Sequence, residues 1–128
     1  MSGSYPDAED VVTTLLSDLG YACTFLPGKD DWDDLVPIIA VNRVGGGSDG
    51  ITDRPLLQIG VLAATRTAAW EVAGKCRDRI LASGNSRVGG VLIDATRESQ
   101  GVQQFPDLNP DNRFVASTYQ FDFRRSFA

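Results

Sequence analysis

Histidine is missing from the 128-residue sequence, and its absence removes several kinds of active site. Without an imidazole there is no Ser-His or Cys-His nucleophile pair and no histidine ligand for a metal ion. The carboxylates gather between residues 30 and 34, in what reads as a solvated loop, so a hydrolase with paired acids in an apolar cleft is disfavoured. The sequence therefore predicts a protein that is not an enzyme and that uses no cofactor.

Cysteine and long apolar runs are also scarce. Cys23 falls in a predicted strand and Cys76 on the inner face of a predicted helix, and no secretory segment precedes them. We expect two buried, reduced thiols in a cytoplasmic protein, not a disulfide or a metal site. No apolar run approaches the length that crosses a membrane, so we expect a soluble protein without membrane contact.

Positive charge is nearly absent from the first quarter of the chain. Up to Asp34 the sequence contains eight of its 17 acidic residues but only one of its 12 basic residues, Lys29. The net charge of −5 therefore divides into −7 up to Asp34 and +2 beyond it. We expect an acidic end and a mildly basic end, a division that matters if copies or partners stack on the domain. No basic stripe with interleaved aromatics is present, which argues against sequence-specific DNA binding.

The segment from Pro55 to Leu81 contains a strand that runs directly into a helix. Residues 56–62 are too apolar for a strand with one wet face, so they predict a central strand with both faces covered. From Arg66 the apolar residues recur at helical spacing and the charged residues fall on the opposite side. This helix must lie on a sheet, and Val88–Thr96 supplies the further strand that a crossover unit needs.

The remaining elements complete one domain, for which we predict the class α+β. The order α-β-β-β-α-β-β gives a mixed sheet of about five strands with two helices packed on it, and residues 1–5 form a loose start. The first helix opens at Pro6 and Asp7, carries an apolar stripe to Leu19 and stops at Gly20. The other predicted strands are 21–26, 35–43 and 115–124. In the last of these, one face is expected to be buried and the other wet, and the residues of the buried face are Val115, Ser117, Tyr119, Phe121 and Phe123.

The acidic segment Lys29–Asp34 contains Trp32. Four aspartates suggest calcium, but the glycine and the distal glutamate of a calcium loop are missing, which favours a solvated loop. Trp32 either folds back onto the domain or anchors a partner, and the sequence does not decide between the two.

Two long connections are predicted, at residues 44–54 and 98–112. The first is rich in glycine but joins two strands and lacks the Lys-Ser or Lys-Thr of a phosphate loop, so it reads as a flexible hairpin tip that orders against a neighbour, or as a merely floppy tip. The second connection is long for a structureless loop in a small domain, which favours a loop with a function of its own. After it, Asp122, Arg124 and Arg125 place charges on the exposed face or edge of the last strand.

Several stretches together resemble the tail terminator proteins of long-tailed, siphovirus-type bacteriophages, also described as tail completion or minor tail proteins. The resemblance rests on the layout of the elements and on Val36-Pro37, the Arg-x-Gly-Gly run from Arg43 to Gly46, and the Tyr-x-x-x-Phe-Arg run from Tyr119 to Arg124. It covers nearly the whole chain. The acidic segment around Trp32 is the part for which the resemblance predicts nothing.

The resemblance implies a structural virion protein, one subunit of a hexameric ring on the head-proximal end of the tail, assembled in the host cytoplasm. Such a ring caps the tail tube, stops its polymerisation and joins it to the head connector, while DNA passes through the lumen without being read. We hypothesise that the two long connections contact the tube or a neighbour. Pairs between subunits would involve Arg43, Asp53, Arg54, Arg97 and Arg113. The hypothetical interface residues are Trp32, Arg43, Gly46, Asp49, Asp53, Arg54, Arg97, Arg113 and Arg124. Two alternatives stay open: a connector or stopper protein at the same junction, and a small monomeric α/β domain that binds a ligand.

Overall fold

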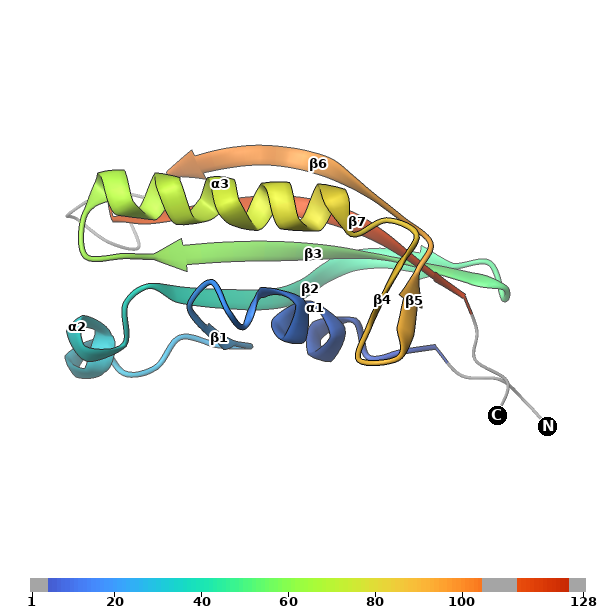
Figure 1. Cartoon of the computed structure of the whole chain (residues 1–128), viewed down its shortest axis with the longest axis horizontal. Coiled ribbons are helices and arrows are strands. Elements are labelled where there is room, and N and C mark those ends of the chain that lie inside the picture. Colours follow the sequence, from blue (N-terminus) through green and yellow to red (C-terminus); the bar gives the residue numbers. More distant parts are fainter. Residues whose placement is uncertain (1–4, 105–112, 125–128) are drawn as a thin grey trace.

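A computed structural model describes residues 5–104 and 113–124. Within them the chain forms a five-stranded mixed sheet that carries two main helices (Figure 1), which confirms the predicted α+β class. The elements are α1 (Ala8–Leu16), β1 (Tyr21–Cys23), the 3-10 turn η1 (Lys29–Asp31), α2 (Trp32–Leu35), β2 (Ile38–Ser48), β3 (Thr52–Leu62), α3 (Arg66–Ala82), β4 (Ser86–Val88), β5 (Val91–Ile93), β6 (Ala95–Gln104) and β7 (Phe114–Arg124). No helix in these two ranges is long and apolar enough to cross a membrane.

The strands of the main sheet lie in the order β1-β2-β3-β7-β6. Only β1 and β2 are parallel, and the other three ladders are antiparallel. As predicted from its apolar run, β3 lies at the centre. β7 is also an internal strand, so the charges at its end do not protect an edge as the sequence suggested.

The crossover after α3 differs from the prediction. The stretch Val88–Thr96 is not one strand, because Gly89 and Gly90 adopt φ of +56° and +82° and turn the chain back into the small β4–β5 hairpin. The strand that returns to the main sheet is β6, which begins at Ala95. It runs in the same direction as β3 but lies beyond β7, since both β3 and β6 are antiparallel to β7.

Both main helices begin at the side-chain caps that their sequences provide. The Asp7 carboxylate accepts a hydrogen bond from the Asp10 backbone N at 3.2 Å, and the Thr65 hydroxyl accepts one from the Ala68 N at 3.1 Å. α1 ends at Leu16, earlier than predicted, because the next backbone N–H groups bond three residues back in tighter turns.

The two faces of the sheet are covered differently. The main core lies under α1 and α3, and it includes Ile59 of β3 together with the alternate residues of β7 that the sequence predicted to be buried. A smaller core on the opposite face combines Ile38, Leu62 and Phe114 with Trp32 of α2. The rest of that second face is lined by polar side chains such as Gln58 and Gln120, which are half-buried.

The two predicted long loops are shorter than expected. β2 continues to Ser48 and β3 starts at Thr52, so residues 44–54 are mostly paired strand, with Gly47 opposite Arg54 and Ser48 opposite Asp53. Residues 98–104 belong to β6, whereas 105–112 lie outside the described residues, as do residues 1–4 of the predicted loose start and Arg125. Glycine permits the extended ladder at 45–47 because it leaves the two backbones free to approach.

Candidate assembly interface

Residues 44–54, which we call the hairpin arm, project past the ends of α3 and of the β4–β5 hairpin (Figure 1). A β-bulge at Val44, where the register shifts between Arg43 and Gly45, introduces the arm. Just beyond it Gly46 adopts a φ of +90°, and a Cβ atom there would lie 2.1 Å from the Arg54 carbonyl oxygen. Only glycine fits this position. The close approach of the two strands therefore explains why the last residue of the Arg-x-Gly-Gly run, Gly46, is a glycine.

The tip of the arm is held by its own polar contacts. The Asp49 carboxylate accepts hydrogen bonds from the backbone N atoms of Ile51 and Thr52 at 3.0 and 2.8 Å. These bonds, helped by Arg54, lower the pKa of Asp49 from 3.8 to about 2. Gly50 completes the turn with a φ of +89° and donates to the Ser48 hydroxyl at 3.1 Å. These contacts between residues 48 and 54 define the turn at the tip of the arm.

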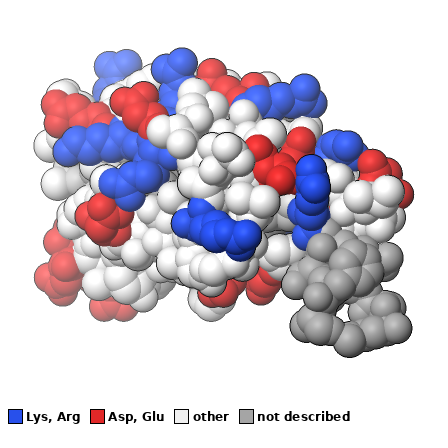
Figure 2. All heavy atoms as spheres, turned by 45° about the vertical axis from the view of Figure 1, so that its right-hand side comes forward, with Lys and Arg blue, Asp and Glu red and all other residues white. Residues whose placement is uncertain are grey.

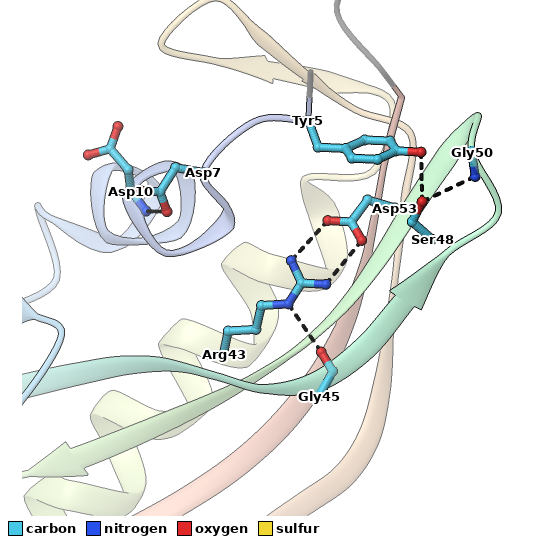
Figure 3. Close-up of polar contacts among 8 residues, drawn as sticks. All are labelled: Tyr5, Asp7, Asp10, Arg43, Gly45, Ser48, Gly50 and Asp53. Atoms are coloured by element: carbon cyan, nitrogen blue, oxygen red, sulfur yellow. Dashed lines mark hydrogen bonds and ion pairs between the residues drawn. The ribbon is translucent and has the colours of Figure 1, made fainter. Parts of the chain in front are cut away.

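The base of the arm is fastened by a bidentate ion pair (Figure 3). Both terminal nitrogens of Arg43 lie 3.0 Å from the carboxylate oxygens of Asp53, and the Arg43 Nε donates to the Gly45 carbonyl at 3.3 Å. The Asp53 side chain is buried, whereas that of Arg43 is about one third exposed. Such a pair fixes the relative position of β2 and β3 where the arm begins.

The first residues of the chain also contact the arm. The Glu9 carboxylate accepts a hydrogen bond from the Arg43 backbone N at 3.0 Å. The Ser48 hydroxyl donates to the Tyr5 hydroxyl at 2.7 Å (Figure 3). The start of α1 and the segment before it therefore brace the arm at its base and near its tip.

The charged residues proposed for subunit contacts all have partners within the chain. Pairs between subunits stay a prediction, since the contacts described here lie within one chain. The pairs are Arg43 with Asp53, Arg54 with Asp49 at 3.1 Å, Arg97 with Gln120 at 2.8 Å, Arg113 with Asp33 at 3.0 Å, and Arg124 with Asp94 at 2.8 Å. Gly46, Asp49, Asp53 and Arg54 lie in the arm, with Arg43 at its base and Arg124 of β7 opposite Thr52. Arg97 of β6 and Arg113, just before β7, lie away from the arm.

Trp32 folds back onto the domain. Its side chain is buried, its Nε1 donates to the Pro27 carbonyl at 2.9 Å, and the Arg113 guanidinium lies 5.9 Å from its ring centre. The acidic segment around it forms η1 and α2 instead of a loop, with Asp30, Asp31, Asp33 and Asp34 exposed. Of the two roles that the sequence left open for Trp32, packing is the one observed, because the ring fills the second core.

Charge is distributed in two ways over the surface. The exposed aspartates of η1 and α2 lie at the end of the molecule opposite the hairpin arm (Figure 1). On the face that carries the arm, described residues of both signs are interspersed with uncharged surface (Figure 2). In the described ranges no group of three or more Cys, Asp or Glu side chains is placed to hold a metal ion.

Sequence reasoning missed the exposed apolar side chains. Val44 and Ile51 of the arm, and Phe25 after β1, are exposed although they are large and apolar. A usable signal existed for Ile51, which is the single apolar side chain within the run of turn-forming residues from Gly45 to Asp53. Single exposed apolar side chains are common on protein surfaces, so none of the three marks a contact surface by itself.

Comparison with known proteins adds a family and a structural neighbour. The family model described as phage tail termination protein matches residues 4–128. No curated protein matches the chain. Among solved structures, a chain of "Virion of native gene transfer agent (GTA) particle" is similar, with a TM-score of 0.48 and 10% sequence identity. That match covers 93% of this chain and 85% of the other.

Proposed function

Because the chain belongs to the phage tail termination protein family, whose model spans residues 4–128, we propose that it closes the end of the tail tube. Membership makes it a structural component of the phage tail. In the proposal, six copies form a ring on the head-proximal end of the finished tube. The ring stops further polymerisation of the tube and offers its other face to the head connector.

The family match is the observation that carries this proposal, and the geometry supports it. A ring subunit needs two unlike surfaces, because each copy contacts the next through a different patch of its own surface. The rigid hairpin arm at one end and the acidic η1–α2 segment at the other supply such a difference. Complementary charge would favour the correct orientation during assembly.

The partners in this proposal are further copies of the chain, the tail tube protein and a head–tail connector protein. Assembly takes place in the host cytoplasm. Genomic DNA passes through the lumen of the ring without sequence readout, which would require base-edge contacts from a groove-reading element.

Removal of the arm tests its place in this function. A phage that encodes the chain without Gly46–Gly50 should produce overlong tubes or tails that fail to join heads, as seen by electron microscopy. Tails of normal length joined to heads would show that the arm is not needed. Far-UV circular dichroism of the purified variant checks that it folds.

A matched control is Gly47→Ala, which alters the same segment at a position where a Cβ atom would meet nothing within 4 Å. Its tails should be normal. Light scattering of the wild-type protein, alone and with tube protein, separates the ring from a monomeric binding domain by mass. A stopper at the same junction would bind the head connector and leave tube length unchanged.

A further inference from the structure

The two edges of the main sheet are protected in different ways. At one edge, the register of β6 with β7 shifts twice, between Glu98 and Gln100 and again before Gln103. Such irregularities bend a strand and keep other strands from pairing with it. At the other edge, β1 pairs with β2 only from Ile38 to Ala40, and within the described ranges no strand continues along the outer edge of β2.

The uncovered edge of β2 runs into the hairpin arm. The Arg43 backbone N–H donates to Glu9 of α1, which lies outside the sheet, so this N–H points away from β3. One bulge interrupts the edge at Val44, and glycines follow at 45–47. Glycines have no side chains to keep another strand away, and glycine-rich strands specify their pairing weakly. An edge of this kind is a template for pairing with another chain.

The segment of residues 5–9 follows this edge. Glu9 accepts from the Arg43 N at 3.0 Å, and Tyr5 accepts from the Ser48 hydroxyl at 2.7 Å (Figure 3). The two contacts are four residues apart in the segment and five residues apart in β2, so the segment runs alongside the strand. Pro6 lies between them and has no backbone N–H, so the segment covers the edge without offering a full row of new donors.

The contact of Glu9 differs from that of Tyr5 because it occupies a backbone donor. A pairing strand would use that same N–H, and a carboxylate binds it through a charge-assisted hydrogen bond. Glu9 lies in the first turn of α1, whose start is fixed by the Asp7 cap. A competing strand therefore has to displace a carboxylate that the body of the domain holds in place.

We propose that Glu9 guards the outer edge of the hairpin arm and prevents β2 of one copy from pairing with β2 of a second copy. Identical edges pair with two-fold symmetry, and such a contact is closed after two chains. It would occupy the arms of both copies and remove them from any other contact. The guard does not rest on the proposed ring, because the pairing that it prevents takes place between free chains.

Self-association of the purified protein tests the guard. In sedimentation velocity, Glu9→Ala should show a concentration-dependent dimer that the wild type lacks. Its association should be about tenfold tighter, because no charge-assisted hydrogen bond has to be displaced. Glu9 is half-buried and lies outside the core, so the variant should keep the wild-type circular dichroism spectrum.

Two control variants separate the hydrogen bond from the charge. Glu9→Gln keeps an acceptor oxygen at the same position and should behave as the wild type. Asp10→Ala removes the same charge from the neighbouring residue, whose side chain is exposed, and should produce no dimer. A Glu9→Gln protein that dimerises as strongly as Glu9→Ala, or a Glu9→Ala protein that does not dimerise, would overturn the proposal.

The Arg43 amide reports where the dimer forms. In hydrogen exchange followed by NMR, this amide should exchange faster in dilute Glu9→Ala than in the wild type, because its acceptor is gone. At high concentration of the variant the exchange should become slower, as the amide pairs with the second copy. A dimer that leaves the Arg43 amide unprotected lies elsewhere and removes the guard.

The guard and the ring fail separately. A wild-type protein that forms no ring with tube protein removes the ring, and the comparison of the Glu9 variants is unaffected. A Glu9→Ala protein without the dimer removes the guard, and the lengths of the tails still decide the ring.

Discussion

Gly46 and Asp49 show how single residues shape the hairpin arm. Gly46 permits a backbone conformation and a close strand approach that any side chain would block. The Asp49 carboxylate accepts hydrogen bonds from two backbone N–H groups of the turn, those of Ile51 and Thr52. One residue acts through the absence of a side chain and the other through its charge, and each leads to a measurable prediction.

Gly46→Ala should lower the free energy of unfolding by about 1–3 kcal/mol, because the positive φ and the clash with Arg54 cannot both be relieved. Gly47→Ala is the matched control in the same strand, with open space and no positive φ, and should not destabilise the protein. Urea denaturation followed by tryptophan fluorescence measures both. Equal losses would show that the close approach at Gly46 is not rigid.

The turn of the arm should depend on pH through Asp49. Its pKa is lowered from 3.8 to about 2, so the charged form stabilises the turn above about pH 4 and this contribution is lost as the pH falls towards 2. In NMR spectra, the Ile51 and Thr52 amide signals should move with a midpoint near 2. Asp49→Asn keeps an acceptor oxygen and should abolish that transition. A midpoint near 4 would contradict the hydrogen bonds.

Among the elements, β2 and β3 are notable because their ladder continues from the body of the sheet into the hairpin arm, and β7 follows β3 as far as Thr52, which lies opposite Arg124. The outer part of this ladder is held by the pairing of Thr52 and Asp53 with β7, by the ion pair at its base and by contacts from Glu9 and Tyr5. The body of the domain therefore sets the direction in which the arm projects. The ion pair gives the prediction at this level.

Arg43→Ala should cost more stability than Asp53→Ala. The first leaves a carboxylate that is 4% exposed without its partner, with an expected loss of about 3 kcal/mol, whereas the second leaves a guanidinium that is 38% exposed and can hydrate, with an expected loss of about 1–2 kcal/mol. The double variant should lose less than the sum. Urea denaturation of the two single variants and the double variant completes a double-mutant cycle with the wild-type protein. Equal, additive losses would argue against a coupled pair.

The whole molecule is a sheet with one face closed by helices and the other closed only at one end. α1 and α3 bury the centre of the sheet, while Trp32 covers the far face near Phe114. Stability should therefore be greatest in β3 and β7, which are paired on both sides. The β4–β5 hairpin forms a separate two-stranded sheet and should be the least protected of the strands.

Hydrogen exchange measured by mass spectrometry checks this distribution. Peptides from β3 and β7 should exchange slowest, because opening them requires breaking ladders on both sides and exposing the main core. Peptides from β4 and β5 should exchange fastest among the strands. Slow exchange in β4 and β5 comparable to that in β3 would contradict the described packing.

Much of the local structure could be predicted from the sequence. The cap at Asp7 marks where α1 begins. The apolar run after Pro55 and the alternation along β7 indicate which side chains are buried, because burial follows the period of each element. The split of Val88–Thr96 could not be predicted, since it depends on the conformation of two glycines. The ladder within the arm could not be predicted, because a glycine-rich segment has no alternation of apolar and polar side chains to indicate a strand.

The candidate site was predicted in part. The sequence selected the arm and its charged residues, but it did not show that Arg43 and Asp53 pair with each other across the hairpin, nor that Trp32 is buried. Phe25 and Ile51 were not selected at all. Their exposure becomes visible only when the rest of the chain is placed around them.

The sequence by itself determined the class of fold, the two helices and the central strand, because the spacing of apolar residues sets which face of each element avoids water. Only the tertiary structure decided the strand order, the internal position of β7, the partners of the arginines and the reach of the hairpin arm. Those features depend on contacts between residues far apart in the chain, and such contacts leave no periodic trace in the local pattern.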